Sequence, residues 1–154
     1  MAIKATDLRW YSLNMDGGLS SRIAPATLHN VFGPITGAQN RDGITQYKII
    51  AVVNEHASLP LTAARIYFRT VQSGGANIAM ALDTLGPANK TGVVWTVGGT
   101  PTTFVSPVTF GTGLLVSTLN PGFAVAIWLR RSISSAAALR PEKTTLTIAG
   151  TTAA

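Results

Sequence analysis

The sequence predicts an all-β fold, a single domain in which two sheets pack as a sandwich. Glycine and proline are frequent, with 15 and 8 residues, and they interrupt the whole length of the chain. Between these breakers lie short runs rich in β-branched and aromatic residues, a pattern typical of sandwiches and barrels. We favour a jelly-roll-like arrangement, with an immunoglobulin-like sandwich as the alternative, because the pattern itself does not separate the two.

The length of 154 residues fits one domain that spans residues 1–154. A chain of this size can bury a hydrophobic core without covalent staples. The absence of cysteine excludes disulfides, thiolate zinc sites and cysteine nucleophiles. We expect residues 151–154, all threonine and alanine, to form a flexible tail.

Alternating hydrophobicity predicts the strands of the first half of the chain. They are expected at residues 8–13, 45–54, 65–71 and 77–84, with a loop-like region from 20 to 42 that contains a short strand at 28–32. Residues 45–54 are apolar on both faces, which predicts a central strand covered on both sides. In the strand at 65–71, Ile66 and Phe68 point inward, whereas Arg65, Tyr67 and Arg69 point outward.

The second half repeats the pattern of short strands between turns. Strands are expected at residues 92–97, 102–110, 113–117, 123–133 and 144–149. In the longest of them, Trp128 and Arg130 lie on the face opposite Val125 and Ile127. The total is enough for two packed sheets.

Charge is distributed unevenly along the chain. Charged residues make up 12% of the sequence, and 12 basic against 6 acidic residues give a net charge of +6. Lys90 and Arg130 bracket a segment, residues 91–129, that contains no Asp, Glu, Lys or Arg. Part of this segment must reach the surface, and an uncharged surface of this kind predicts contact with another subunit.

No arrangement of residues indicates an enzyme. The six carboxylates are scattered and are interpreted as solvated turn residues. His29 and His56 lack the spacing of a metal site. Glycine pairs such as Gly17-Gly18 are interpreted as hairpin turns, since none follows a strand and opens a helix. The sequence therefore predicts no catalytic, cofactor-binding or metal-binding residue.

Seven residues are candidates for contact with a partner. Arg65, Tyr67 and Arg69 interleave cations with an aromatic ring, which suits a protein interface and also single-stranded nucleic acid. Trp128 lies opposite the predicted core face, so a second core layer, a subunit contact and a ligand platform are all open. The full set is Arg65, Tyr67, Arg69, Trp95, Trp128, Arg130 and Arg131.

Nucleic acid is the less favoured partner, despite the positive charge. The basic residues are dispersed, and only Arg130 and Arg131 are adjacent. Nothing matches a zinc finger or the aromatic motif of an RNA-recognition sheet. The surplus charge would more simply attract an acidic protein surface.

We expect neither a membrane span nor a signal peptide. The longest apolar run, residues 123–129, is far shorter than the roughly 20 residues of a membrane helix. No apolar stretch follows Lys4 as it would in a signal peptide. The lack of cysteine fits synthesis in a reducing cytosol.

Several segments resemble small virion proteins of tailed bacteriophages. The similar runs are residues 12–20, 30–33, 43–54, 126–131 and 145–148. The resemblance implies a β-sandwich that decorates or cements an icosahedral head as a symmetric oligomer, and it implies no catalytic residue. Arg130 and Arg131 fall within a similar run and are contact residues on that basis. The basic charge departs from that of an outer head protein and leaves a tail or inner-head location open.

The function we expect is that of a non-enzymatic structural component of a bacteriophage virion, a capsid decoration or cement protein that bridges capsid subunits. Its partners would be the major capsid protein or other virion proteins. It would form a homo-oligomer, with a trimer favoured, and would be made in the host cytoplasm. The alternatives are a tail-associated adhesion or carbohydrate-binding module, suggested by tryptophans and glycine-rich loops, and a nucleic-acid-binding protein.

Overall fold

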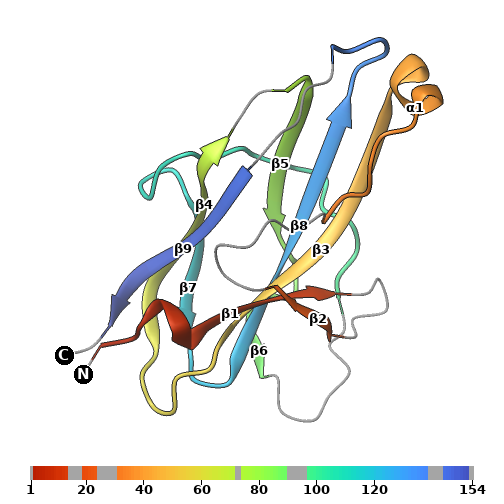
Figure 1. The fold of residues 1–154 in the computed structure, drawn as a ribbon. Helices are drawn as coiled ribbons and strands as arrows, with labels where there is room; N and C mark the ends of the chain where they lie inside the picture. Colours follow the sequence, from red (N-terminus) through yellow and green to blue (C-terminus); the bar gives the residue numbers. More distant parts are fainter. Residues whose placement is uncertain are drawn as a thin grey trace.

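Two antiparallel sheets face each other across one core in the computed structural model of the chain (Figure 1). The structure describes residues 2–13, 19–23, 31–71, 74–89, 97–138 and 144–152. Its long elements are all strands, so the predicted all-β sandwich is confirmed. The described helices are the short 3-10 turn η1 (Ala5–Asp7) and α1 (Gly37–Asp42), and neither has the length or apolar character needed to cross a membrane.

The two sheets are unequal in size. The larger sheet has the strand order β2-β1-β3-β8-β5, with β6 paired to β8, and the smaller sheet has the order β7-β4-β9. The strands are β1 (Leu8–Leu13), β2 (Leu19–Ile23), β3 (Ile44–Asn54), β4 (Leu61–Val71), β5 (Ala76–Leu82), β6 (Ala88–Asn89), β7 (Leu114–Leu119), β8 (Phe123–Ile133) and β9 (Thr144–Thr152). All pairs of neighbouring strands are antiparallel.

The strand pairs are nested along the chain. Strand β3 pairs with β8, β4 pairs with β7, and β5 is bridged at Met80 to Val105 in the segment that precedes β7. Such nesting arises when a long antiparallel hairpin is wound across two sheets, as in a jelly roll. The connectivity therefore favours the jelly-roll alternative over the immunoglobulin-like one.

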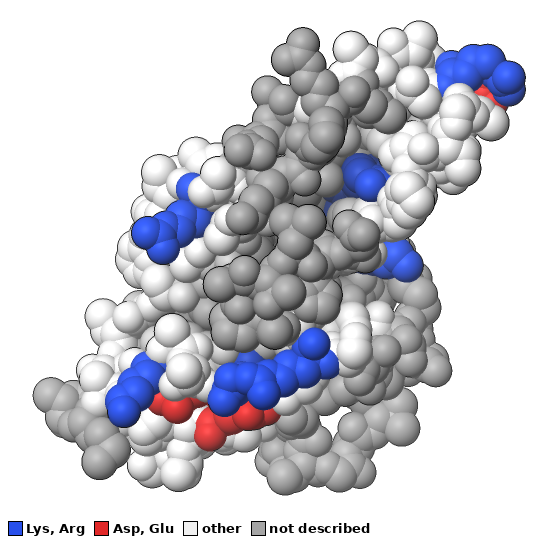
Figure 2. Space-filling model, viewed as in Figure 1, with Lys and Arg blue, Asp and Glu red and all other residues white. Residues whose placement is uncertain are grey.

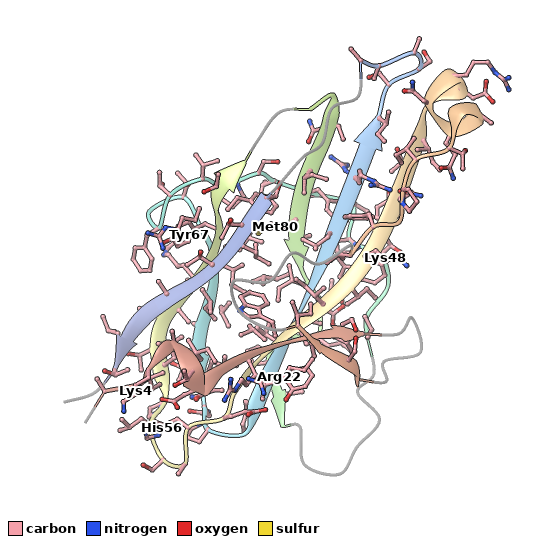
Figure 3. All side chains as sticks on the ribbon, in the orientation of Figure 1. Lys4, Arg22, Lys48, His56, Tyr67 and Met80 are labelled. Atoms are coloured by element: carbon pink, nitrogen blue, oxygen red, sulfur yellow. The ribbon has the colours of Figure 1, made fainter. Side chains whose placement is uncertain are left out.

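Apolar side chains from both sheets fill the space between them. This core includes Ile50 and Val52 of β3, Ile66 and Phe68 of β4, and Met80 of β5, each at most 4% exposed. Figure 3 shows Met80 between the two sheets. The predicted inward and outward alternation of β4 is confirmed, because its even-numbered apolar residues are buried in this core.

The larger sheet also carries a second apolar layer on its outer face. Ile49, Ala51, Ala126 and Trp128 belong to this layer, and Phe104 packs against it from the segment before β7. Strand β3 is thus buried on both faces from residue 49 onward. This confirms the prediction of a central strand covered on both sides.

The structure corrects the predicted strand at residues 102–110, because this segment crosses between the sheets instead of running along one of them. The Val105 amide and carbonyl bond to Met80 in the larger sheet, at 2.9 and 2.8 Å. Two residues later, the Pro107 carbonyl accepts a hydrogen bond from the Phe68 amide of the smaller sheet, at 2.8 Å. Proline lacks the amide hydrogen that a continuing strand would need.

Three other predicted segments differ from the structure or lie wholly or partly outside the described residues. Residues 151 and 152, which we expected in a flexible tail, belong to β9, where the Thr151 and Thr62 hydroxyls bond across the strands at 2.9 Å, and residues 153 and 154 lie outside the described residues. The predicted strand at 92–97 lies almost entirely outside the described residues. So does the strand at 28–32, except for Val31 and Phe32, which form a bend.

Helix α1 replaces part of the expected loop. The Thr36 hydroxyl accepts the Gln39 amide at 3.2 Å, and the Gln39 side chain accepts the Thr36 amide at 3.1 Å. This capping box begins the helix. Gly43 ends it with φ of 76° and ψ of 156°, a backbone region that is essentially restricted to glycine.

We predict that Gly43→Ala lowers the free energy of unfolding by about 1–3 kcal/mol. Besides the backbone strain, a methyl group here would lie 3.0 Å from the Ile133 carbonyl oxygen and 3.1 Å from the Ser135 nitrogen. Urea denaturation measures the change. Gly37→Ala is the matched control, because an added methyl group meets nothing within 4 Å there. Equal stability of the two variants would contradict the prediction.

Candidate interaction surface

The outward side chains of β4 meet apolar side chains from β7 and from the turn before it. Arg65 lies opposite Leu115 of β7, and Tyr67 lies opposite Thr147 of β9. The Tyr67 ring meets the Phe110 ring edge-on, with centroids 6.4 Å apart and an interplanar angle of 85°. We call Arg65, Tyr67, Phe110 and Leu115 the β4 patch. Figure 3 shows Tyr67 on the outer side of the sandwich.

The turn at residues 109–113 is fixed onto β4. The Arg65 guanidinium donates to the Gly113 carbonyl at 2.8 Å, and the Thr109 and Thr112 hydroxyls bond to each other at 2.9 Å. A side chain at Gly113 would crowd the Arg65 Cβ atom at 3.1 Å. The exposed ring of Phe110 is therefore held in place by the turn rather than carried on a loose loop.

Exposed apolar side chains concentrate in the segment that lacks charge. Of the six large hydrophobic residues that are most exposed in the described part of the chain, four lie within residues 91–129: Val105, Val108, Phe110 and Leu115, at 41–57% exposed. The lack of charge in residues 91–129 predicted an interaction surface in this segment, although none of these four residues was predicted individually. Arg69 and Val108, both exposed, lie two positions along the chain from Tyr67 and Phe110 at the margin of the β4 patch.

Trp128 belongs to the core, so its assignment as a contact residue is corrected. Its side chain is 2% exposed, and its Nε1 atom donates to Asp83 Oδ1 at 3.0 Å. Asp83 is itself 4% exposed and also accepts the amides of Gly98 and Leu85, at 3.0 and 3.2 Å. This carboxylate is therefore not a solvated turn residue, because it ties the outer layer of the core to two loops.

Arg130 and Arg131 point to opposite faces of β8, as neighbours on a strand must. The Arg130 guanidinium lies 4.8 Å from the centre of the Phe104 ring, which in turn contacts Tyr47 at a centroid distance of 5.7 Å. Tyr47 is 40% exposed. These three side chains form a second place where a cation and aromatic rings reach the surface.

Arg131 binds groups of its own chain. Arg131 donates to the Gly33 carbonyl at 2.7 Å and to the Gln46 side chain, and its guanidinium lies 4.8 Å from the Phe32 ring. It thus anchors the segment before α1 to β3. Of the predicted contact residues, Arg65 and Tyr67 lie on the same face of β4, Arg69 lies at the irregularity between Phe68 and Thr70, and Trp95 lies outside the described residues.

Acidic side chains are engaged inside the molecule, whereas part of the basic surface is not. Glu55 bonds to the Tyr11 hydroxyl at 2.6 Å, and Asp7 accepts the Lys4 amide at 2.8 Å. Hydrogen bonds to Asp42 raise the pKa of the exposed Arg41. Figure 2 shows acidic side chains next to basic ones, while other basic side chains are surrounded by uncharged residues.

The β4 patch has no acidic counterpart of its own. Neither Arg65 nor Arg69 forms an ion pair with any residue that the structure describes. Arg65 bonds to backbone carbonyls, which leave its charge uncompensated. The patch therefore combines exposed aromatic and aliphatic area with the uncompensated positive charge of Arg65, and the exposed Arg69 adds a second such charge further along β4.

The described residues offer no site for a metal ion, since they contain no cluster of three His, Asp or Glu side chains. His56 has a structural role, because its Nδ1 atom accepts the amides of Ser58 and Leu59 at 3.1 and 2.9 Å. No protein-family model matches the sequence, and comparisons with curated proteins and with solved structures give no match either. The chemistry of the surface is therefore the basis for assigning a function.

We predict that Asp83→Ala lowers the free energy of unfolding by about 2–4 kcal/mol, because it leaves the buried Trp128 indole and two partly buried amides without an acceptor. Chemical denaturation measures the loss. Asp42→Ala serves as the control, since its ion pair with Arg41 lies largely in solvent and its loss should leave the free energy of unfolding almost unchanged. A loss as small for Asp83→Ala as for the control would contradict this role.

Proposed function

We propose that the chain is a non-enzymatic structural protein of a bacteriophage virion, which binds an assembled protein lattice as a capsid decoration or cement protein. The observation that carries this proposal is the β4 patch. Its rigid Phe110 and Tyr67 rings, exposed Leu115 and adjacent arginines have the composition enriched in protein interfaces.

The charge of the patch indicates the kind of surface that it would bind. Arg65 and Arg69 lack acidic partners among the described residues, while the described acids are engaged elsewhere. A complementary partner surface would carry carboxylates around an apolar centre, because opposite potentials steer association and suppress wrong partners. The proposed partner is therefore an acidic, partly apolar patch that is repeated across the capsid.

Such binding would stabilise the shell by mass action. A protein that contacts two neighbouring capsid subunits binds the assembled lattice more tightly than it binds free subunits. The difference in affinity shifts the equilibrium towards the intact shell, and no catalytic step is needed.

The resemblance to phage virion proteins supports the identity of the lattice rather than the position of the contact. Two of its runs, residues 43–54 and 126–131, fall on β3 and β8. These are the central strands of the larger sheet, where most side chains are buried. The resemblance therefore concerns the scaffold, and the contact surface is inferred from the β4 patch alone.

A second candidate function is binding of single-stranded nucleic acid. It is favoured by the arrangement of Arg130 over Phe104 beside the exposed Tyr47, since aromatic rings with a nearby cation can stack with bases. Affinity for a single-stranded oligonucleotide that falls steeply with salt and is lost in Tyr47→Ala would support it. The carbohydrate-binding alternative has less support, because Trp128 is buried and Trp10 packs against the core.

We predict that the chain is present in purified virions at a copy number stoichiometric with the capsid protein. Quantitative mass spectrometry of the particles produced from the genome that encodes it makes this measurement. Washing with salt should release the chain, because the interaction is partly electrostatic. Absence of the chain from the particles would overturn the proposal.

We further predict that Phe110→Ser weakens rebinding to stripped particles by at least about tenfold, as expected for an aromatic residue central to an interface. Leu85→Ser is the matched control, because Leu85 is 55% exposed but lies outside the β4 patch. Co-sedimentation with the particles gives both affinities. If the two substitutions have the same effect, the β4 patch is not the contact.

A further inference from the structure

Among the described residues, strand β9 forms an edge of the smaller sheet. It pairs with β4 on one side, and no described residue bonds to its backbone on the other. The strand is nine residues long and contains neither a charged residue nor proline. A long, uncharged edge of this kind is a template for pairing with another strand.

The other sheet edges have features that discourage pairing. Strand β5 is bridged at Met80 to Val105, and β2 is five residues long and includes Arg22. Strand β7 is six residues long, and its Ser117 has a φ of 71°, which interrupts the regular edge. Bridging strands, short length, charge and irregularity are the usual protections of an edge.

Strand β9 is regular along its length. The two irregularities in its pairing with β4 place the extra residue in β4, between Thr62 and Arg65 and between Phe68 and Thr70. On β9 itself, Leu146 and Ile148 lie opposite the buried Phe68 and Ile66 and so face the core. The open edge therefore has the uninterrupted alternation that a pairing strand requires.

The two sheets are unequal in width, and the described residues cover some apolar side chains of the larger one only in part. The smaller sheet has three strands against six in the larger one. On the larger sheet, Leu8 and Trp10 of β1 and Ile23 of β2 pack against the core but are only partly buried. A strand added beside β9 would widen the smaller sheet to match the larger one.

We propose that β9 pairs in antiparallel fashion with β9 of a second copy of this chain. The two smaller sheets would then join into one continuous sheet with the order β7-β4-β9-β9-β4-β7. The pairing uses the backbone edge and leaves the outward face of the β4 patch free. It goes beyond the proposed function, because it concerns association between copies rather than binding to a capsid.

The sequence of β9 favours a second copy as the occupant. The strand begins with Thr144-Thr145 and ends with Thr151-Thr152. Antiparallel pairing centred on Ile148 therefore places threonine opposite threonine at both ends, and such cross-strand pairs are favourable. The chain already uses one, since the Thr62 and Thr151 hydroxyls bond at 2.9 Å.

Charge and symmetry favour the same occupant. Two copies of a chain with a net charge of +6 can approach most closely where neither carries charge, and β9 is such a segment. A two-fold arrangement also covers both open edges at once, so the assembly closes instead of growing into a fibre. The proposed pair differs in symmetry from the trimer that the sequence suggested.

Light scattering coupled to size exclusion tests the pairing on the full chain. We expect a mass of twice 16.1 kDa for the unaltered protein and a single chain mass for Thr147→Lys. The substitution places an ammonium beside the seam in each copy, and the dissociation constant should rise by at least about tenfold. Thr118→Lys, on the exposed part of β7 at the opposite edge of the same sheet, should remain a dimer.

Disulfide cross-linking gives a second readout that does not depend on loss of association. The chain has no cysteine, so Ile148→Cys can form a disulfide only between copies. Mild oxidation should convert it to a covalent pair, and Thr118→Cys should stay uncrosslinked. A monomer at every concentration, a trimer, or a dimer that Thr147→Lys leaves intact would each overturn the proposal, whatever the outcome of the particle-binding experiments.

Discussion

The structure depends on the burial of β3 and β8 on both faces of one sheet. The two strands pair along nearly their full length, from Ile44 with Ile133 to Val53 with Ala124. A strand that is apolar on both faces must be covered twice. The smaller sheet covers the inner face, and the segment around Phe104 packs on the outer layer. Two polar side chains in the described part of the chain are buried, those of Asn54 and Asp83. Each forms hydrogen bonds with backbone groups of the segments that pack over the two faces of this sheet.

The need for two covers explains why residues 91–129 carry no charge. In the described part of this segment, residues 123–129 form the buried half of β8. Residues 97–107 pack on the outer layer and then cross to the smaller sheet, where the Pro107 carbonyl bonds to Phe68. A charge in either place would be costly to desolvate. Burial does not account for Phe110 and Leu115, which are 43% and 51% exposed, and this excess is what indicates a partner.

Periodicity predicted the elements in which burial repeats every two residues. The alternation of Ile66 and Phe68 with Arg65 and Tyr67 is of this kind, whereas the burial of β3 on both faces was predicted from its continuous apolar run. Features set by single contacts between distant residues were not predictable. The crossing at Val105 and Pro107 looks like a strand in sequence, and Asp83 looks like a turn residue until Trp128 is placed beside it. The candidate site was not predictable either, because Tyr67 and Phe110 are distant in the sequence and the order of the strands places their rings in contact.

The distribution of polar groups distinguishes the two surfaces for which we propose protein partners. The β4 patch has uncompensated arginines and exposed rings, so a partner there must supply opposite charge and apolar area. The edge of β9 has neither charge nor rings, and it offers backbone groups that any extended strand can satisfy. A second copy lacks a surplus of acid and is poorly suited to the patch, but it fits the edge without bringing like charges together. Under the two proposals, specificity follows from what each surface lacks: the patch disfavours copies of the same chain, and the edge pairs with them.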